Sequence, residues 1–366
     1  MNNSKKSNEL NESKMQKEVS KNIYPNYISF LQTNRTKEQA EEIFNQRIKD
    51  SKEVFNKFSL SFSERVCPTC GNSESKELTP FHDSYGVVQC NFCLTNYVNP
   101  CPSLEALNYY YNECSCNALL GSLLRSRHGK SNHILSERTD FILKLLKEHF
   151  LDKGSIKILE IGCNSGIFLS ELKDAVAISM PDKKFHFYGI DIDRSAIEQN
   201  VDAEIMLEAT SVEEYAVTKS EKFDLILHFE LIEHLENPFS FMKSVRLIMA
   251  DNGLHHFHTP NANGFDNMAI GYNDFRPLAH GIFPPMHLQA FTPHNILHFA
   301  LRSEFKLLQI DTPGGFDVDI VRNFLSNPEE SKFRYIKEIP SEYLAVFQEW
   351  LKVLGASSHM RVTLKA

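Results

Sequence analysis

Four of the eight cysteines form two C-x-x-C pairs, Cys67 with Cys70 and Cys90 with Cys93, and nineteen residues separate the pairs. Thiolates are strong zinc ligands, and two pairs at this separation suit one tetrahedral site. Gly71, directly after the first pair, provides the freedom that a tight turn needs. A closed four-cysteine site has no open position for a substrate, so we expect a structural zinc.

A second group with ligand chemistry is the run E-L-I-E-H, in which Glu230, Glu233 and His234 are three and four residues apart. On a helix, this spacing places all three side chains on one face. Carboxylate oxygens favour Mg²⁺ or Mn²⁺, and such an ion would bind a substrate hydroxyl and lower its pKa. The alternative is a metal-free site, in which the histidine packs or acts as a general base.

The segment IKILEIGCNSGIFLSEL has the pattern of a strand, a tight turn and a helix, with Glu160, Gly162, Asn164 and Gly166 around the turn. A dinucleotide fingerprint needs glycines at positions 162, 164 and 167, and this chain has Asn164 and Ile167 at the last two. The segment is therefore not a pyrophosphate loop. Its glycines and the amides that begin the helix still offer close backbone approach to a ligand.

The elements that must position these residues follow from residue 155 onward, where short apolar runs alternate with amphipathic helical stretches. This alternation is typical of βαβ units and a parallel sheet. We predict an α/β fold with a Rossmann-like sheet of seven strands and a helical insertion at about 312–358. The predicted strands are Ile156 to Ile161, Phe185 to Asp191, Ala203 to Leu207, Phe223 to Phe229, Leu254 to Thr259, Phe305 to Asp311 and Met360 to Lys365.

The pattern E-x-G-x-x-x-G resembles the S-adenosylmethionine (SAM) motif of class I methyltransferases, and the resemblance continues over roughly residues 136–325 and the final strand. It implies that Asp191, which ends the run YGIDID, binds both ribose hydroxyls. It also implies that Glu208 lies beside the adenine and that Ala209 offers its backbone. The full set of implied SAM contacts is Glu160, Gly162, Asn164, Gly166, Asp191, Glu208, Ala209 and His228.

The E-L-I-E-H run resembles the E-x-x-E-H metal site of small-RNA terminal 2′-O-methyltransferases and of some quinone-biosynthesis O-methyltransferases, with His287 as the downstream histidine of the former. This implies that Glu230, Glu233, His234 and His287 hold Mg or Mn. Without a metal, the catalytic candidates are Glu233 and the bases His234 and His287. Prolines exclude a regular helix around His287, and we predict that residues 271–291 cover the substrate. The alternative is a structured surface connection.

Upstream of the sheet we predict three parts. Residues 1–62 comprise a polar flexible tail and a helical hairpin, because apolar positions recur at helical intervals from residue 27. Residues 63–118 form a zinc-ribbon-like module, and residues 119–366 the methyltransferase domain. The passage after the ribbon resembles bacterial methyltransferases of sugar and surface-polysaccharide pathways. The sugar C-methyltransferases among them have a further C-terminal domain, which argues against C-methylation here.

Composition narrows the function. A net charge of −8 disfavours nucleic acid as the partner, because non-specific affinity for it comes mostly from Lys and Arg. We expect a cytoplasmic protein without a membrane segment, since no long apolar run occurs. The prediction is O-methylation of a sugar, a sugar nucleotide or another small polar metabolite. The alternatives are an RNA methyltransferase of the 2′-O type, with the ribbon as a clamp, and a catalytically silent SAM-binding scaffold.

Overall fold

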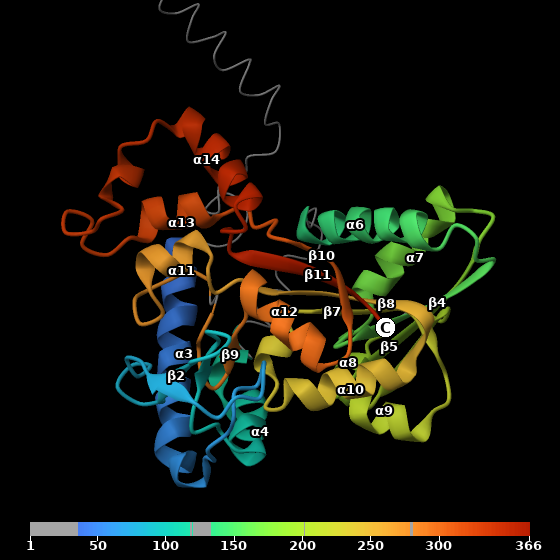
Figure 1. Ribbon diagram of the computed structural model, residues 1–366, viewed down its shortest axis with the longest axis horizontal. Helices are drawn as coiled ribbons and strands as arrows, with labels where there is room; N and C mark the ends of the chain where they lie inside the picture. The colour runs from blue at the N-terminus through green and yellow to red at the C-terminus, as the bar shows by residue number, and fades with distance from the viewer. Residues whose placement is uncertain (1–35, 118, 120–132, 201, 279–280) are drawn as a thin grey trace, which may run out of the picture.

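The computed structural model describes residues 36–117, 119, 133–200, 202–278 and 281–366, and a seven-stranded sheet forms the centre of its larger part (Figure 1). The strand order is β10-β11-β8-β7-β4-β5-β6, and β11 is antiparallel to both of its neighbours. All seven predicted strands are confirmed. They are β4 (Ser155–Ile161), β5 (Lys184–Asp191), β6 (Ile205–Ala209), β7 (Phe223–Phe229), β8 (Met249–Pro260), β10 (Lys306–Asp311) and β11 (His359–Lys365).

Two helical layers cover the faces of this sheet (Figure 1). Helices α6 (His133–His149) and α7 (Ile167–Ser179) pack on one face. On the other lie α9 (Val212–Thr218), α10 (Pro238–Ile248) and α12 (Pro293–Arg302). Alternate side chains of a strand point to opposite faces, so Leu225 of β7 joins the first core and Ile226 the second. The central strands are therefore largely apolar, as expected for a sheet covered on both sides, although polar side chains such as Glu160 and His255 are also buried in them.

The N-terminal part is built around one long helix, α3 (Lys37–Phe58). Thr36 and Gln39 form a capping box at its start, which satisfies amides that the helix leaves free. The described residues of this stretch form a single helix followed by a short 3₁₀ turn (Ser59–Ser61), and the predicted hairpin begins at residue 27, outside the described part. Residues 1–35, with the predicted tail, lie outside the described part. Helix α4 (Leu104–Glu113) packs against α3.

The cysteine pairs lie on a small antiparallel sheet made of β1 (Ser75–Glu77), β2 (Val87–Cys90) and β3 (Asn96–Val98). A fourth strand, β9 (Gln289–Ala290), follows β8 in the sequence and pairs with β3. The small sheet therefore includes both an N-terminal segment and part of the connection that follows β8. We call β1, β2, β3 and the cysteine loops the ribbon.

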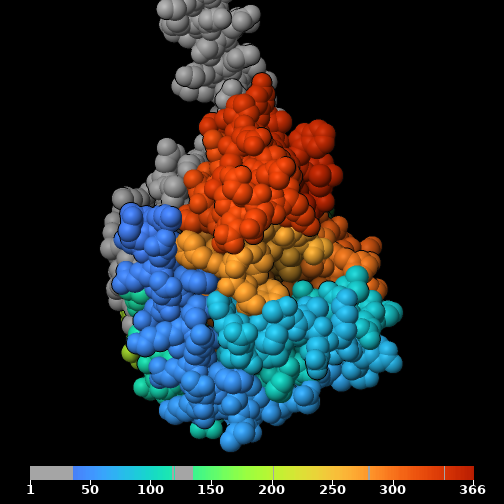
Figure 2. Space-filling model, turned by 90° about the vertical axis from the view of Figure 1, so that its left-hand side faces the viewer, coloured from blue at the N-terminus to red at the C-terminus, as the bar shows by residue number. Residues whose placement is uncertain are grey.

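Between β10 and β11 the chain forms a separate helical layer with its own apolar core. Its elements are α13 (Asp317–Phe324), the 3₁₀ helix η3 (Arg334–Lys337) and α14 (Ser341–Val353), joined by α11 (Phe265–Ile270). Figure 2 shows these helices stacked above α3 and the ribbon. Among the described residues, no helix has the length and apolarity needed to cross a membrane.

Candidate active site

The turn between β4 and α7, residues 162–166, is the glycine turn of the site. Gly162 and Gly166 have φ angles of 75° and 79°, which glycine adopts without steric cost. Gly166 is the N-cap of α7, and the amides of Gly162 and Cys163 donate to the Ile190 carbonyl oxygen at 2.8 and 3.2 Å. The turn is thus held against the end of β5. Cys163 itself is buried, as a small packed side chain.

Asp191, at the end of β5, fixes this turn through its carboxylate. The amides of Asn164 and Asp193 donate to it at 2.8 and 2.9 Å. Each carboxylate oxygen keeps a second lone pair, so two hydroxyl groups of a ribose still find acceptors there. Ala209 pairs with Asp191 in the ladder between β5 and β6. Glu208 points outward and forms an ion pair with Lys219 at 3.0 Å, with 46% of its side chain exposed.

Glu160 is a buried carboxylate beside the glycine turn. Its Oε2 has no hydrogen-bond partner within the described part of the chain. Burial raises the pKa of Glu160 to about 8, although the positive charge of Arg138 opposes the shift. A buried acid with a free oxygen needs a donor or a cation to complete it. The ammonium group of an amino-acid ligand supplies both.

His228 does not project into the site. It is fully buried in β7, stacked on Phe257 with 4.8 Å between ring centroids and edge-on to Phe241. The prediction that His228 contacts SAM is therefore wrong for its side chain, and only its backbone could make such a contact. The strand alternates its side chains between two faces, and position 228 falls on the face covered by α10.

The E-L-I-E-H run is a turn and not a regular helix. Glu230 has a left-handed φ of 50°, and only Ile232–His234 form a single 3₁₀ turn. The expectation that Glu230, Glu233 and His234 share one helical face is wrong, because the left-handed Glu230 lies outside the 3₁₀ turn that contains the other two. The carboxylate of Glu230 instead lies 3.2 Å from His359 Nε2 and 3.8 Å from Arg138.

Three residues of the predicted set do come together, and we call Glu233, His234 and His287 the His–Glu cluster. Their ligand atoms all lie within 4.8 Å of one another. Thr259 donates to Glu233 Oε2 at 2.9 Å, whereas Oε1 has no hydrogen bond among the described residues and lies 3.6 Å from His234 Nε2. Burial raises the pKa of Glu233 and lowers that of His234 to about 4.

Both imidazoles of the cluster are oriented through Nδ1. His287 Nδ1 lies 3.0 Å from the Gly281 carbonyl oxygen, which accepts a hydrogen bond when Nδ1 carries the proton. His234 Nδ1 lies 3.0 Å from the hydroxyl of Tyr111 on α4. This leaves His287 Nε2 for a ligand, as in many metal-binding histidines, whereas the His234 ring also has a hydrogen bond to the Met286 backbone. The sequence carries no local signal for Tyr111, because its contact with His234 spans 123 positions.

The cluster is adjacent to the glycine turn. Strands β4 and β7 are neighbours, and Ile161 pairs with His228 at their carboxyl ends. A Cβ built on Gly162 would lie 3.5 Å from the Leu231 side chain, just before the 3₁₀ turn. Ligands of open parallel sheets bind outside this edge. The glycine turn and the His–Glu cluster therefore lie side by side at this edge of the sheet.

Strand β9 supports the turn that carries Glu233 and His234. The Leu288 amide donates to the Glu233 carbonyl oxygen at 2.9 Å. The Gln289 side-chain amide donates to the carbonyl oxygens of Ile232 and Leu235 at 2.8 and 3.0 Å. Residues 281–291 are all buried, so the alternative of a surface connection is wrong for them. This stretch instead links the ribbon to the site.

The four cysteines of the C-x-x-C pairs lie together, with Sγ atoms within 4.8 Å of one another. The Cys67 to Cys93 and Cys70 to Cys90 Sγ distances are both 3.5 Å. Arg302 of α12 donates to the Cys67 and Pro68 carbonyl oxygens at 3.3 and 3.2 Å, which attaches the first knuckle to the larger part. The arrangement suits a tetrahedral metal.

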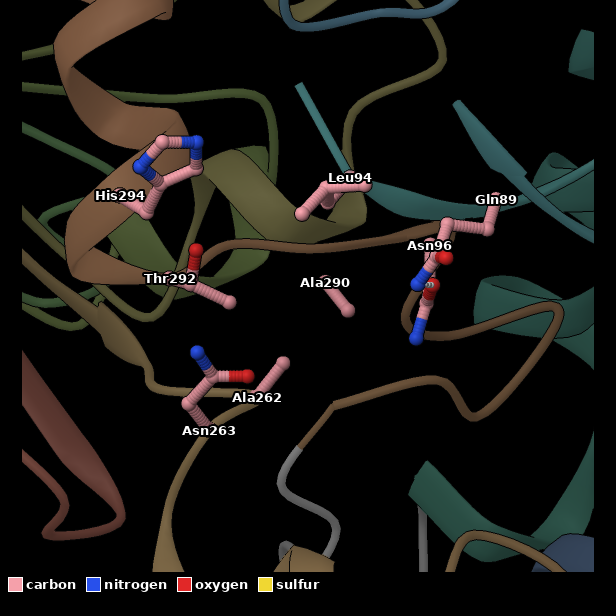
Figure 3. Close-up of a pocket in the computed structure, with 8 residues that line it drawn as sticks. All are labelled: Gln89, Leu94, Asn96, Ala262, Asn263, Ala290, Thr292 and His294. Carbon is pink, nitrogen blue, oxygen red and sulfur yellow. Dashed lines mark hydrogen bonds between the residues drawn. The ribbon is translucent and has the colours of Figure 1, made fainter. Parts of the chain in front are cut away.

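A cavity of about 320 Å³ lies between the ribbon and the larger part (Figure 3). Gln289 of β9 points to the E-L-I-E-H turn, and the next residue, Ala290, faces the cavity. Successive strand residues point in opposite directions, so the backbone of β9 separates this cavity from the His–Glu cluster. The cavity is lined by Gln89, Leu94, Asn96, Ala262, Asn263, Ala290, Thr292 and His294.

Comparison with known proteins matches residues 132–310 to a family model described as a methyltransferase domain. The ubiquinone biosynthesis O-methyltransferase of Glaesserella parasuis serovar 5 is 27% identical over 205 residues, covering 52% of this chain and 78% of that protein. The protein of the same name from Rickettsia typhi is 28% identical over 129 residues, covering 34% of this chain and 47% of that protein. The chain thus spans about half the length of this second relative.

One similar solved structure is that of the plantazolicin methyltransferase BpumL in complex with SAH. It is 14% identical to this chain, and the alignment covers 71% of this chain and 93% of that chain with a TM-score of 0.44.

Proposed function

We propose that this SAM-dependent methyltransferase, whose residues 132–310 match a methyltransferase-domain model, methylates a hydroxyl group of a small polar acceptor. The observation that carries this proposal is the His–Glu cluster at the carboxyl edge of the sheet, directly beside the glycine turn. The similarity to proteins named O-methyltransferases supports oxygen as the methyl acceptor.

In the proposed complex SAM lies over the glycine turn. Asp191 accepts hydrogen bonds from the ribose hydroxyls, and Glu160 accepts one from the ammonium group. Ala209 and the outward-pointing Glu208 border the adenine. The support for this placement is that Asp191 keeps free lone pairs and that Glu160 Oε2 is buried without a partner among the described residues. Methyl transfer from the SAM sulfonium then requires the acceptor oxygen to lie in line with the bond between sulfur and the methyl group.

Activation of that oxygen is the harder requirement. The pKa of His234 is lowered to about 4, chiefly by burial, so the imidazole is neutral at pH 7. A base of that strength is poorly matched to a hydroxyl that ionises near the pKa of water, ~15.7. The hydroxyl must therefore become more acidic before an imidazole of the cluster can take its proton.

We include a divalent ion at the His–Glu cluster for this reason. The cluster fits such an ion, because Glu233 Oε1 is buried without a hydrogen bond among the described residues and both Nδ1 atoms are already held. Glu233, His234 and His287 would hold it, and Glu230 would not. A bound ion lowers the pKa of a hydroxyl that it coordinates. Two imidazoles and one carboxylate favour Mn²⁺ over Mg²⁺.

A structural zinc at Cys67, Cys70, Cys90 and Cys93 completes the proposal, supported by the grouping of the four sulfurs. The acceptor class that we propose is a sugar, a sugar nucleotide or a similar polar metabolite. RNA is disfavoured by the net charge of −8.

The proposal is tested by supplying methyl-labelled SAM and a small-molecule cell extract to the full chain. We expect an O-methylated product that disappears after exhaustive chelation and returns with Mn²⁺, while zinc content is monitored so that loss of the ribbon is recognised. His234→Ala and Glu233→Gln should lower transfer by about 100-fold or more, within the range for groups that activate a nucleophile. The matched control is His149→Ala, on the exposed end of α6.

Two results would contradict this proposal in different ways. Full methyl transfer after chelation would remove the ion and leave His234 or His287 as the general base. Absence of any labelled product would indicate a SAM-binding scaffold.

A further inference from the structure

We propose that the methyl acceptor carries an oxyanion, a phosphate or carboxylate group, which Arg47 of α3 and Tyr111 of α4 bind beside the His–Glu cluster. This inference rests on the proposed function, because it assigns the acceptor of that same site. It gives the N-terminal helices a direct part in substrate recognition. In Figure 1, α3 and α4 lie beside the sheet, on the side of β9.

Arg47 lies next to Phe283, which forms an isolated β-bridge with His287. Its Cζ lies 5.8 Å from the centre of the Phe283 ring. Phe283 and His287 exchange two backbone hydrogen bonds, at 3.2 and 2.9 Å, so the guanidinium adjoins the backbone that holds His287. Beyond burial, which is the largest cause, the positive charge of Arg47 contributes to the lowered pKa of both His234 and His287.

Among the described residues, this arginine has no carboxylate partner of the kind that a structural arginine usually has. Its Nε is buried without a hydrogen bond, and no described carboxylate forms an ion pair with it. Asp50, one turn along α3, is already bonded to Gln46 and to the Cys116 amide. At 5.8 Å the contact with Phe283 is near the ~6 Å limit of a cation–π interaction and uses none of the N–H donors.

Tyr111 supplies the second donor. Its side chain is 41% exposed, and its hydroxyl lies 3.0 Å from His234 Nδ1. When His234 Nε2 binds a ligand, Nδ1 carries the proton and donates a hydrogen bond to the Tyr111 oxygen. The Tyr111 hydroxyl then donates its own hydrogen bond to another acceptor.

An oxyanion on the substrate would accept hydrogen bonds from both Arg47 and Tyr111. A guanidinium has a planar fork of donors that matches two oxygens of a carboxylate or a phosphate, and the phenol adds a third hydrogen bond. A neutral sugar hydroxyl would leave the positive charge of Arg47 uncompensated in a half-buried position. Charge and donor geometry therefore favour an anionic acceptor over a neutral one.

The first test measures binding of inorganic phosphate and of acetate to the full chain by calorimetry, with zinc content verified. We expect Arg47→Met to weaken binding of the preferred anion about tenfold or more, as for loss of a charge-assisted pair. Arg47→Lys should retain part of the affinity, and Tyr111→Phe should weaken it less. Arg334→Met, on an exposed residue of η3, is the matched control and should change nothing.

SAM affinity, measured in parallel, shows that each variant is folded. Equal anion binding by the unsubstituted chain and Arg47→Met would overturn the inference, as would no binding of either anion.

A second test examines the labelled product itself. We expect it to bind an anion-exchange resin at pH 7. Release from the resin after phosphatase treatment would identify a phosphate monoester, release only after phosphodiesterase and phosphatase together would identify a phosphodiester such as a sugar nucleotide, and retention after both would identify a carboxylate. A labelled product that is neutral would overturn this inference and leave the proposed methyl transfer intact, whereas absence of product counts against the proposed function.

Discussion

The carboxylates at the carboxyl edge of the sheet differ in role because their surroundings differ. Asp191 accepts two backbone hydrogen bonds, whereas Glu230 faces Arg138 and His359. Contact with Glu230 raises the pKa of His359 even though burial acts in the opposite direction. Glu160 Oε2 has no hydrogen bond among the described residues, and burial raises the pKa of Glu160 to about 8 although the charge of Arg138 opposes the shift. Burial therefore favours the protonated form of Glu160 at neutral pH.

Glu160 makes SAM affinity depend on pH. In the free protein its raised pKa means that the carboxyl is largely protonated below pH 8, whereas the ammonium of SAM favours the carboxylate. Binding should therefore release a proton, and affinity should increase as pH rises from about 6 to 8. Calorimetry in buffers of different ionisation enthalpy measures this release. Glu160→Gln should bind SAM more weakly and without the pH slope; the same slope in the variant would show that another group is responsible.

At the scale of elements, the ribbon and the site are connected through β9. This strand pairs with β3 on one side, and its neighbour Leu288 and its own Gln289 bond the E-L-I-E-H turn on the other. Arg65 adds a second link, with donors to the carbonyl oxygens of Val98, Leu288 and Glu236. A metal at the four cysteines would thus stabilise more than the ribbon itself.

Removal of the ribbon metal should consequently impair catalysis more than cofactor binding. The double change Cys90→Ser and Cys93→Ser should eliminate one zinc per chain and loosen β3 and β9. We expect methyl transfer to fall by about tenfold or more, because each supporting hydrogen bond that is lost, of two or more, costs ~1 kcal/mol. SAM affinity should stay nearly unchanged, since the glycine turn has no contact with the ribbon in the described structure. Elemental analysis and calorimetry measure the two effects.

Cys101→Ser removes a buried thiol that is not part of the four-cysteine group and serves as the control. Zinc-free protein that transfers methyl groups at the full rate would refute the connection through β9.

For the whole molecule, the core beneath α10 contains two buried histidines whose side chains are unpaired in the described structure. His228 and His255 lie with 5.0 Å between ring centroids, and neither ring has a hydrogen bond there. Burial lowers the pKa of His255 to about 3 and that of His228 well below its usual range. Both rings are therefore neutral in the folded state, and the unfolded chain alone takes up protons below pH ~6.5.

This difference should make the fold sensitive to acid. A histidine whose pKa is lowered by folding contributes full stability above pH ~6.5 and loses up to about 1.4 kcal/mol per pH unit below it. The double change His228→Leu and His255→Leu should reduce the pH slope of the free energy of unfolding by up to twice that amount. Urea unfolding at pH 7, 6 and 5 measures the slope, with His149→Leu as the exposed control. An unchanged slope in the double variant would mean that other groups cause the acid sensitivity.

The sequence by itself determined the features that depend on local pattern. Apolar runs of strand length predicted the seven strands. At the centre of the sheet the reason is burial on both faces, whereas the edge strands β6 and β10 are partly exposed. The spacing of Gly162 and Gly166 predicted the turn, since those positions require left-handed φ angles. The two C-x-x-C pairs predicted the four-cysteine group in the same way, because each knuckle is local.

Only the tertiary structure decided which side chains meet at the site. The left-handed Glu230 separates it from Glu233, and the strand alternation turns His228 into the core. Tyr111 joins His234 from 123 positions away, and β9 completes a sheet that begins near residue 75. Such contacts arise from the packing of whole elements, whose free energy depends on all of their partners at once. A spacing rule that assumes a regular helix therefore cannot anticipate them.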